Sequence, residues 1–452
     1  MLQKNILVIG TGKSGLGCAD LLCRLGASVV LFDEDRNKNI DDIKNLIMQD
    51  NGNVRILLGE LTDEEIKQFD LAVPSPGIAL DTGLMLRIKE SGIKIISEIE
   101  LAYLNMKGKL VAITGTNGKT TTTSLTGELL KQVYNKVLVV GNIGEAFTAH
   151  ALETSNDSVT VAEVSSFQLE TIDRFHPDVS AVLNITPDHL NRHYTMENYA
   201  GIKKRIFKNV GKGDVCVFNF NDKYTYEFGM ESGLPKILWF SSSKRPPCGF
   251  WLSHDRIIEI DGKEEREILT FSDCLLKGRV GAENIMAALC ICKGLGIDAA
   301  TLAAAVKSFK PVPHRIEFIA NKRGVDYYND SKATNPDSAI CGIEAMTKPT
   351  ILIGGGYDKN NSYDEWIESF KGRVKELVLI GQTADNIAKC AEKHGFTSFC
   401  KKDGFKEALE YCTSKAKDGD AVLLSPACAS WGMFPNYEVR GDEFRDYVNS
   451  LK

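Results

Sequence analysis

The chain has 452 residues, of which 43% are apolar and 25% are charged, a composition typical of globular proteins. Its length predicts about three domains, and its net charge of −6 with a pI near 5.8 argues against a nucleic acid or an anionic membrane as partner. Small molecules are therefore the expected partners.

No segment stays apolar over the length needed to cross a bilayer, and the first residues lead into a glycine turn without the features of a signal peptide. The sequence therefore predicts a cytoplasmic protein. Its twelve cysteines are scattered, without a Cys-x-x-Cys pair or a histidine at zinc spacing, so we expect buried, reduced thiols that serve packing.

Residues 1–96 alternate short apolar strands with helical stretches, which predicts an open parallel sheet of the Rossmann type. We expect a helix over residues 16–25, stopped by Gly26. The expected strands cover residues 6–9, 29–32, 56–58, 71–73 and 93–96.

A glycine-rich turn, Gly10-Thr11-Gly12-Lys13-Ser14-Gly15, follows the first of these strands, and Asp33 ends the second. Glycines allow the backbone to approach a diphosphate at a helix N-terminus, and the carboxylate can accept a hydrogen bond from a ribose hydroxyl. Pro74-Ser75-Pro76-Gly77 supplies a second loop at the same edge of the sheet. NAD, a nucleotide diphosphate sugar and an unliganded turn all remain compatible with this pattern.

Residues 97–310 contain the most informative motif, in which an apolar run at 110–113 is followed by Thr114-Gly115-Thr116-Asn117-Gly118-Lys119-Thr120-Thr121. A strand, a glycine turn and a helix that begins with Lys and Thr direct backbone N–H groups and an ammonium at one position, as a polyphosphate requires. The motif is a shorter form of the general phosphate loop, because Ile113 stands where that loop has its first glycine. We therefore predict a central parallel domain that binds ATP with Mg²⁺.

Other strands of this segment deliver polar side chains to the same edge, because ligands of open parallel sheets gather where the strands end. The expected strands cover residues 137–140, 159–164, 179–184 and 215–219. Glu163 ends one of them, where a carboxylate suits Mg²⁺, and Asp188 and His189 follow another. Tyr199 and Lys203 lie four residues apart on one helix face. Lys204 and Arg205 stand beside them, and this basic stretch by itself predicts a solvated helix for Lys203.

Residues 311–452 again alternate strands and helices, and they predict a second Rossmann-like domain. The expected strands cover residues 350–353, 376–380 and 421–424. The whole chain is thus expected to be α/β, with a phosphate-loop domain between two Rossmann-like domains.

Four motifs taken together resemble the Mur ligases of peptidoglycan synthesis, in the same order and over essentially the whole chain. These motifs lie at residues 115–120, 163–169, 184–189 and 330–335. A closing motif, Leu424-Ser425-Pro426-Ala427-Cys428-Ala429-Ser430, resembles the members that add D-glutamate to UDP-N-acetylmuramoyl-L-alanine.

The resemblance implies an ATP-dependent amide ligase. The terminal carboxylate of UDP-N-acetylmuramoyl-L-alanine would be phosphorylated, and the D-glutamate amine would attack the acyl phosphate, with ADP and phosphate as products. ATP and two Mg²⁺ ions are the implied cofactors, with Thr120 and Glu163 serving the first metal. The implied catalytic residues are Lys119, which holds the β/γ-phosphates, His189, which helps to hold a second metal, and Lys203. Lys203 matches a lysine that becomes a carbamate and thus an anionic metal ligand, which changes the interpretation of its helix.

The resemblance also assigns binding residues to each ligand. For ATP they are Gly115, Thr116, Asn117, Gly118, Lys119, Thr120, Thr121, Asn284, Arg315 and Asp330. For the uridine, diphosphate and muramoyl-alanine parts of the other substrate they are Lys13, Ser14, Asp33, Glu34, Gly77, Asn142 and Ser165, which favours UDP over NAD. For D-glutamate they are Thr334, Lys359, Ser430 and Tyr437, and an ammonium with hydroxyls suits a carboxylate.

Since the residues for ATP lie mainly in the second segment and those for D-glutamate in the third, we expect a hinge near residues 310–313 and closure on ligand binding. A monomer is the default expectation. Three other functions match parts of the sequence. A folate-type polyglutamate ligase lacks the nucleotide-binding front segment, a regulatory nucleotide-binding protein needs no D-glutamate residues, and sibling ligases lack the closing motif.

Overall fold

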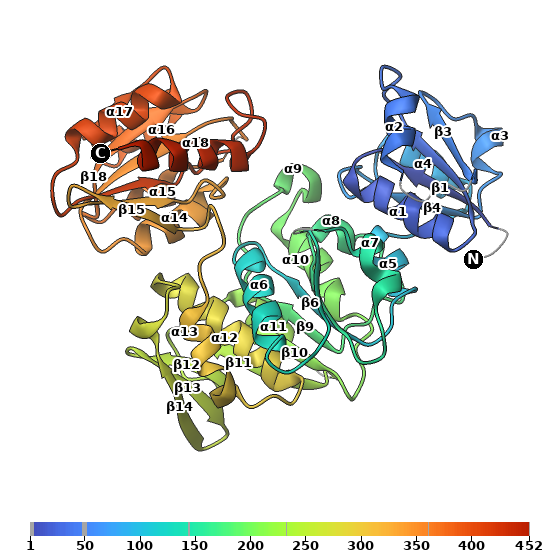
Figure 1. Cartoon of the computed structure of the whole chain (residues 1–452), viewed down its shortest axis with the longest axis horizontal. Coiled ribbons are helices and arrows are strands. Elements are labelled where there is room, and N and C mark those ends of the chain that lie inside the picture. The colour runs from blue at the N-terminus through green and yellow to red at the C-terminus, as the bar shows by residue number, and fades with distance from the viewer. Residues whose placement is uncertain (1–3, 48–51, 143–144, 232, 360, 452) are drawn as a thin grey trace. The chain divides into compact units, whose positions relative to one another are not determined.

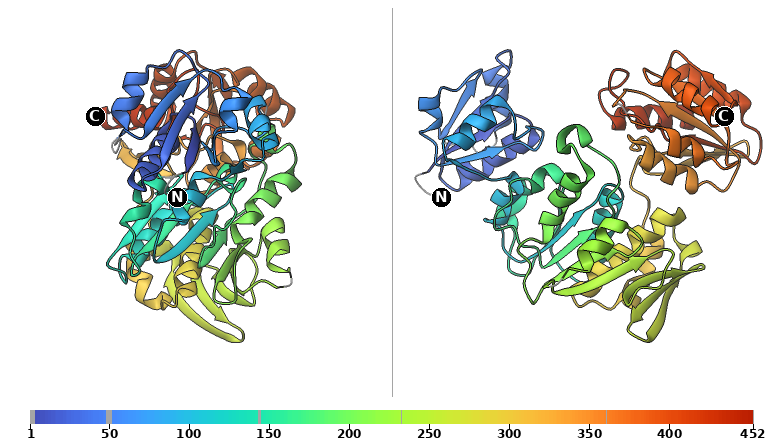
Figure 2. Two further views of the ribbon diagram at one scale, coloured as in Figure 1. Left: turned by 90° about the vertical axis from the view of Figure 1, so that its right-hand side faces the viewer. Right: turned by 180° about the vertical axis from the view of Figure 1, so that it is seen from behind.

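The computed structural model describes residues 4–47, 52–142, 145–231, 233–359 and 361–451 (Figure 1). Within these residues the strands form three sheets of five, nine and six strands, and parallel pairing dominates (Figures 1 and 2). The predicted class, α/β with three domains, is confirmed. By its contacts the chain divides into two compact units: the first comprises the residues up to 185, 189–269 and 284–306, and the second comprises 186–188, 270–283 and the residues from 307 onward.

The first sheet is parallel, in the order β3-β2-β1-β4-β5. Its strands are β1 (Asn5–Ile9), β2 (Ser28–Asp33), β3 (Val54–Leu58), β4 (Leu71–Pro74) and β5 (Lys94–Ile95). The helices are α1 (Lys13–Arg24), α2 (Ile40–Leu46), α3 (Asp63–Ile66) and α4 (Gly83–Glu90). Along β1, Ile6 and Val8 belong to one core cluster and Leu7 and Ile9 to another, so both faces are buried, as in a doubly wound domain.

The predicted number of strands in this sheet is confirmed, but the bounds of several elements differ from the prediction. All five expected strands are present, although β5 is shorter than predicted. The first helix begins at Lys13, three residues before the predicted start, because the glycine turn leads directly into helical backbone.

The nine-stranded sheet has the order β14-β13-β12-β11-β10-β9-β6-β8-β7. Its strands are β6 (Lys109–Thr114), β7 (Val137–Gly141), β8 (Val159–Glu163), β9 (Val179–Val182), β10 (Val215–Asn219), β11 (Lys236–Ser241), β12 (Cys248–Ser253), β13 (Arg256–Asp261) and β14 (Glu264–Thr270). The helices are α5 (Glu98–Tyr103), α6 (Lys119–Leu130), α7 (Phe147–His150), α8 (Ser166–Leu169), α9 (Leu190–His193), α10 (Met196–Lys204), α11 (Lys223–Gly229), α12 (Gly278–Gly294) and α13 (Ala303–Ser308). Ile113 on β6 pairs with Glu163 on β8 and with Ala181 on β9, so these three strands end side by side.

Strands β11 to β14 are absent from the sequence prediction. β12 and β13 pair antiparallel, and on β13 only Ile257 and Ile260 are fully buried while both end residues are exposed. On β14 the first four residues are exposed and three of them are Glu. A search for apolar runs overlooks β13 and β14, because few of their residues are buried and none of these form a continuous run. β11 does contain a buried run, residues 238–241, which the sequence analysis missed.

The third sheet has the order β15-β16-β20-β17-β18-β19, with only the β15–β16 pair antiparallel. Its strands are β15 (Glu317–Lys322), β16 (Val325–Asn329), β17 (Thr350–Gly355), β18 (Val374–Ile380), β19 (Phe399–Lys401) and β20 (Ala421–Leu424). The helices are α14 (Pro336–Glu344), α15 (Asp364–Glu368), α16 (Ala384–Lys393), α17 (Phe405–Lys415) and α18 (Tyr437–Ser450). Core residues of α14, α15 and α16 pack on one face of the sheet, and those of α17 and α18 on the other.

The three strands predicted here are β20, β17 and β18, which lie next to one another in the sheet. They are buried on both faces and therefore read as nearly continuous apolar runs. β15, β16 and β19 carry polar or exposed residues and were not predicted.

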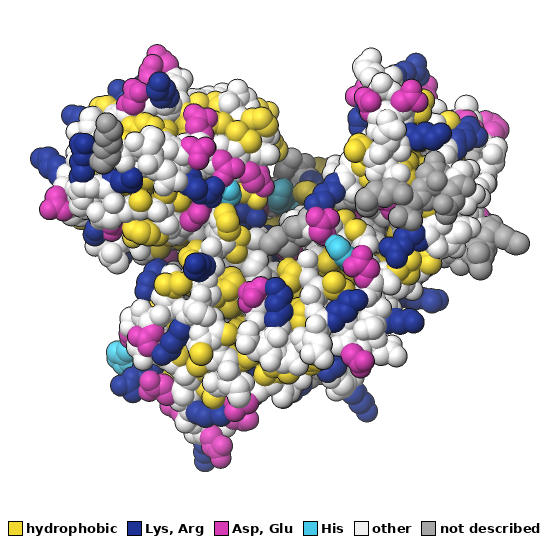
Figure 3. Space-filling model, viewed as in Figure 1, with side chains coloured by type: hydrophobic (Ala, Val, Ile, Leu, Met, Phe, Trp, Pro, Cys, Tyr) yellow, Lys and Arg dark blue, Asp and Glu magenta, His cyan; other side chains and the backbone are white. Residues whose placement is uncertain are grey.

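Among the described residues, no helix combines the length and the apolar content needed to cross a bilayer. All twelve cysteines are free thiols, eight of them buried and four partly buried. On the face of the molecule shown in Figure 3, basic and acidic side chains are interspersed and do not gather in a block of one sign.

Candidate functional site

The predicted phosphate loop lies between β6 and α6, and Gly118 precedes the helix. Its φ is +83°, and a Cβ added there would lie 2.4 Å from Oδ1 of Asn284, so the turn requires glycine. Asn184, which follows β9, accepts a hydrogen bond from the backbone N–H of Asn117 at 2.8 Å and donates one to its carbonyl oxygen at 3.0 Å. The neighbouring strand thus fixes the loop, a role that the sequence analysis did not assign to Asn184.

Two lysine ammonium groups meet at the carbonyl oxygens of this loop. Nζ of Lys119 donates to the carbonyl oxygens of Gly115 and Thr116 at 2.8 and 2.7 Å. Nζ of Lys203, on α10, donates to the same Gly115 oxygen at 2.8 Å and lies 4.8 Å from the ring of Tyr199. Tyr199 and Lys203 share a face as predicted, but Lys203 is only 1% exposed, so the solvated interpretation is wrong for this residue.

The carboxylate of Glu163 ends β8 and is 2% exposed. Its Oε1 accepts a hydrogen bond from Nδ2 of Asn142 at 2.9 Å, whereas its Oε2 is buried and has no hydrogen-bond partner within the described part of the chain. A buried carboxylate oxygen without a donor is unfavourable, and a cation would satisfy it. Thr120, at the second position of α6, is equally buried and adds a hydroxyl oxygen, so this set suits Mg²⁺.

His189 precedes α9 with a φ of +54°, a left-handed conformation that is uncommon outside glycine. Its ring centroid lies 4.9 Å from that of Phe167, in an edge-to-face arrangement. The guanidinium of Arg192 lies 4.2 Å from the centroid of the same Phe167 ring and forms two hydrogen bonds with Glu170, at 3.0 and 2.6 Å. Phe167, Arg192 and Glu170 therefore form an aromatic and ionic cluster beside His189.

Arg192 also reaches the first sheet. It donates to the carbonyl oxygens of Pro76 and Ile78 at 2.8 and 2.9 Å, and these two residues flank Gly77, a predicted substrate residue. The sequence analysis missed Arg192. No local motif could have revealed it, because its carbonyl partners are 116 and 114 residues away along the chain.

The glycine turn of the first sheet places Lys13 and Ser14 at the start of α1. A Cβ added at Gly15 would lie 1.8 Å from the carbonyl oxygen of Gly10, so the helix can approach the turn only with glycine. A Cβ added at Gly10 would lie 2.7 Å from Oγ of Ser75, which shows that the loop after β4 lies beside the turn. The structure therefore brings the two predicted loops together.

The carboxylate of Asp33 stabilises this turn through hydrogen bonds. Its Oδ2 accepts hydrogen bonds from the backbone N–H and the hydroxyl of Thr11 at 3.0 and 2.7 Å, and from Nζ of Lys38 at 2.6 Å. Partial burial acts to raise the pKa of Asp33, but the hydrogen bonds from Lys38 and Thr11 outweigh it and lower the pKa to about 2. The neighbouring Glu34 is exposed, as is Gly77.

Ser165 precedes α8 and caps it. Its Oγ accepts a hydrogen bond from the backbone N–H of Gln168 at 3.3 Å and donates one to Oε1 of the same residue at 2.9 Å. This reciprocal pairing fixes the start of the helix directly after the Glu163 strand.

Arg315 and Asp330, both predicted for ATP, lie in the second unit, whereas the phosphate loop and Asn284 lie in the first. Asp330 is 2% exposed and accepts hydrogen bonds from Oγ of Ser425 at 2.7 Å and from the backbone N–H of Ile316 at 3.3 Å. Burial raises the pKa of Asp330 to about 7, against the lowering effect of the Ser425 hydrogen bond and of Arg315. Nε of Arg315 is itself buried without a hydrogen-bond partner among the described residues.

The loops that follow β16, β17 and β20 are joined by hydrogen bonds at one edge of the third sheet. Arg440, 1% exposed, donates to the carbonyl oxygen and hydroxyl of Ser331 at 2.7 and 2.9 Å, and to the carbonyl oxygen of Cys428 at 3.3 Å. The backbone N–H of Tyr357 donates to the carbonyl oxygen of Ala429 at 2.9 Å. Arg440 is a second residue that the sequence analysis missed.

All four residues predicted for D-glutamate belong to the second unit. Nζ of Lys359 lies 5.4 Å from the ring of Trp431, which directly follows the buried Ser430. Tyr437 begins α18, and Thr334 lies two residues before α14. The structure thus brings Lys359 and the Ser430 loop together.

The three segments of the chain match three family descriptions. Residues 4–97 match the N-terminal domain described as Mur ligase MurD-like, residues 113–292 the Mur ligase middle domain, and residues 314–428 the Mur ligase glutamate ligase domain. The chain is 49% identical to the UDP-N-acetylmuramoylalanine--D-glutamate ligase of Lachnospira eligens, over 99% of both chains, and 47% identical to the enzyme of the same name in Lachnoclostridium phytofermentans, over 100% of this chain and 99% of that one.

Solved structures share the fold at lower identity. The UDP-N-acetylmuramate-alanine ligase MurC of Thermotoga maritima aligns over 99% of this chain and 100% of its own, with a TM-score of 0.60 and 17% identity. The MurF ligase of Thermotoga maritima, solved in complex with ADP, aligns over 100% of this chain and 96% of its own, with a TM-score of 0.60 and 18% identity.

Proposed function

The chain belongs to the Mur ligase family, and we propose that it is the member that joins D-glutamate to UDP-N-acetylmuramoyl-L-alanine, with ATP, in the synthesis of peptidoglycan precursors for the cell wall. One observation carries this assignment: the 49% identity over 99% of both chains to a relative named for that reaction. The chain is accordingly an ATP-dependent ligase.

The reaction transfers the γ-phosphoryl group of ATP to the L-alanine carboxylate, and the D-glutamate amine then displaces phosphate to form the amide. Negative charge accumulates on phosphoryl and carbonyl oxygens, so fixed cations and hydrogen-bond donors are needed more than a protein nucleophile. The loop N–H groups and the Lys119 ammonium would bind the β- and γ-phosphates. Asn284, against which Gly118 packs, would contribute to the nucleotide site together with Arg315 and Asp330.

The oxygen atoms of Glu163 and Thr120 are suitable ligands for a metal ion. Mg²⁺, when bound, neutralises charge on phosphoryl oxygens. Oε2 of Glu163, which has no hydrogen-bond partner among the residues that the structure describes, and the hydroxyl of Thr120 would hold one ion. His189 with Lys203 would hold a second. For that role the neutral Lys203 amine adds CO2 and releases a proton, which gives an anionic carbamate. The burial of Lys203 beside the Gly115 carbonyl supports a role within the site.

The UDP part of the first substrate would bind at the glycine turn of the first sheet. Open space at Gly12, where an added Cβ would meet no atom within 4 Å, supports this placement, because a diphosphate can approach the backbone there at the start of α1. The proposed residues for this substrate are Lys13, Ser14, Asp33, Glu34, Gly77, Asn142 and Ser165. D-glutamate would bind at Thr334, Lys359, Ser430 and Tyr437, where the Lys359 ammonium would pair with the substrate carboxylate.

Three further properties complete the proposal: the protein acts in the cytoplasm, as a monomer, and closes on its ligands at a hinge near residues 310–313. Cell fractionation and analytical ultracentrifugation check the first two. For the third, small-angle scattering should show a smaller radius of gyration with nucleotide and substrate bound, and an unchanged radius would contradict closure.

The decisive experiment measures phosphate release by the purified protein with ATP, Mg²⁺ and UDP-N-acetylmuramoyl-L-alanine. We expect release only when D-glutamate is the added amino acid. L-glutamate, L-alanine, L-lysine and meso-diaminopimelate serve as comparison. Release with another amino acid would move the chain to a sibling activity, and intact ATP in every mixture would refute the ligase assignment.

A further inference from the structure

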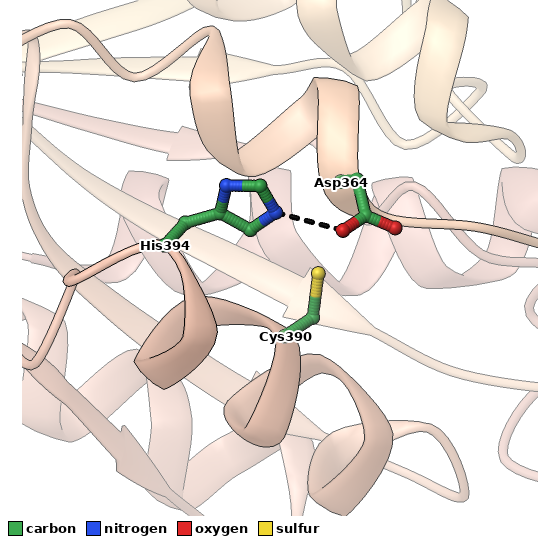
Figure 4. A group of neighbouring side chains, drawn as sticks. All are labelled: Asp364, Cys390 and His394. Atoms are coloured by element: carbon green, nitrogen blue, oxygen red, sulfur yellow. Dashed lines mark hydrogen bonds and ion pairs between the residues drawn. The ribbon is translucent and has the colours of Figure 1, made fainter.

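Three side chains of the second unit point toward one another from two helices, apart from every residue assigned above (Figure 4). Asp364 begins α15, Cys390 lies on α16, and His394 directly follows α16. One ligand atom from each, a carboxylate oxygen, a thiol sulfur and an imidazole nitrogen, all lie within 4.8 Å of one another. A tetrahedral zinc ion with bonds of about 2.0–2.3 Å separates its ligand atoms by about 3.3–3.8 Å, so little rearrangement is needed.

The two helices hold these side chains on rigid backbone. Cys390 and His394 are four residues apart and therefore share a helix face. Trp366 and Ile367 of α15 and Ile387 of α16 are buried in one core cluster, which fixes both helices. The sequence analysis treated the cysteines as packing residues, because no Cys-x-x-Cys motif marks this pair and the third group comes from another helix.

A cation at this cluster would take the place of hydrogen bonds made to Asp364. Nε2 of His394 and Nζ of Lys393 both lie 2.7 Å from Oδ1 of Asp364, and the Ser362 hydroxyl donates to Oδ2 at 2.7 Å. The Lys393 side chain is 70% exposed, so it can return to water at little cost when a divalent ion takes its place.

The other imidazole nitrogen has a carboxylate partner. Nδ1 of His394 lies 3.4 Å from Oε1 of Glu368, which is the arrangement that orients metal-binding histidines in proteins. With Nδ1–H directed at Glu368, Nε2 presents its lone pair to the space shared with Cys390 and Asp364.

We propose that Asp364, Cys390 and His394 bind Zn²⁺, with Glu368 as the carboxylate that orients His394 and with water at the fourth position. Sulfur and imidazole ligands favour Zn²⁺ over Mg²⁺, which separates this site from the oxygen-rich set at Glu163. The bound ion would link α15 to α16. It would thereby stabilise α15, which directly follows Tyr363. The Tyr363 hydroxyl lies 3.1 Å from Sγ of Cys428, in the loop before Ser430, so the zinc site would connect to the proposed D-glutamate site.

The test uses the full chain, stripped of metal and kept reduced, in a buffer with excess Mg²⁺ that occupies the ligase metal sites. Zinc affinity is measured by competition with a chromophoric chelator, and Co²⁺ substitution reports sulfur ligation by its charge-transfer absorption. Loss of an outer partner weakens metal binding by roughly 10–100-fold, so we expect about 10-fold for Glu368→Gln and at least about 100-fold for Cys390→Ser and His394→Ala.

Matched controls are Cys400→Ser, another partly buried thiol of the second unit, and His150→Ala, a histidine paired with Glu153 in the first unit. Both should bind zinc like the wild type. Zinc should also raise the unfolding temperature of the wild type and of both controls, and leave that of Cys390→Ser unchanged. Equal zinc affinity in wild type and Cys390→Ser, or no zinc retained by the wild type, would overturn the proposal. Metal-free unfolding curves show whether each variant is folded.

Discussion

The phosphate loop of the first unit and the loops joined by Arg440 in the second unit are both built to hold charged ligands, but they are assembled differently. The phosphate loop is one continuous stretch, residues 114–121, that carries its own cation in Lys119, and Asn184 and Lys203 form hydrogen bonds with it from later in the chain. In the second unit, Arg440 and the Tyr357–Ala429 hydrogen bond join loops that are far apart in sequence. Such a site depends on the tertiary arrangement of the sheet and its loops.

The two regions also differ in how far individual side chains are exposed to solvent. Lys203 beside the phosphate loop is 1% exposed, whereas Trp431, the neighbour of Lys359, is 53% exposed. Buried, fixed charges suit stabilisation of a transition state, and an exposed aromatic ring beside a partly buried ammonium suits capture of a diffusing amino acid. We therefore expect changes in the first region to lower turnover and changes in the second to raise KM for D-glutamate.

The largest effect is expected for Lys119→Ala. Removing the ammonium that lies beside Gly115 should lower kcat for phosphate release by about 10³-fold, because charge on the transferred phosphoryl group loses its fixed counter-charge. Steady-state phosphate release measures it. Lys131→Ala, at the other end of the same helix and paired with Glu128, should retain wild-type activity. Full activity of Lys119→Ala would overturn the site assignment.

Lys203→Ala should lower kcat by about 10²-fold if the residue supplies an anionic metal ligand. Short carboxylic acids added to the assay should restore part of the activity, since a free carboxylate can take the place of the missing carbamate. Lys204→Ala removes the adjacent lysine, which pairs with Glu231 at the surface, and should change little. Unchanged turnover in Lys203→Ala would remove the metal role.

The comparison also explains what the sequence could predict. Glycine turns and phosphate loops are local, and strands such as β17 and β20 are buried on both faces, so both features can be recognised in short windows. The contacts of Arg192 with Pro76 and of Arg440 with Ser331 span more than 100 residues, and the burial of Lys203 depends on packing against the phosphate loop. Those features follow from tertiary structure, which no periodic pattern encodes.

Lys359→Ala tests whether the second region governs the binding of D-glutamate. Loss of a charge-assisted hydrogen bond to the substrate carboxylate is expected to raise KM for D-glutamate by at least roughly 10-fold, with a smaller change in kcat. Initial rates over a range of D-glutamate concentrations measure both. Lys402→Ala is the matched control, because Lys402 also lies over an aromatic ring, that of Tyr411, at 4.3 Å. A change confined to kcat would contradict the proposal that the first region governs turnover and the second governs KM for D-glutamate.

The last comparison concerns the pH dependence of stability, which leaves activity aside. Burial raises the pKa of Asp330 from 3.8 to about 7, so between these values the folded chain holds a proton that the unfolded chain has released. The stabilising contribution of that proton is complete below about pH 4 and is lost as pH rises through about 7, with a slope of up to about 1.4 kcal/mol per pH unit. Asp330→Asn should remove this slope from the free energy of unfolding, measured by urea titration at several pH values.

Ser425→Ala tests the cause of this dependence. The Ser425 hydroxyl donates to Oδ2 of Asp330 at 2.7 Å and thereby lowers the pKa that burial raises. Without this donor the pKa of Asp330 should rise further, so the loss of stability should extend to higher pH than in the wild type. A window that moved to lower pH would contradict this cause, because it would mean that the Ser425 hydroxyl stabilises the protonated form of Asp330 and not its carboxylate. In the first unit, by contrast, Lys38 and Thr11 stabilise the charged form of Asp33.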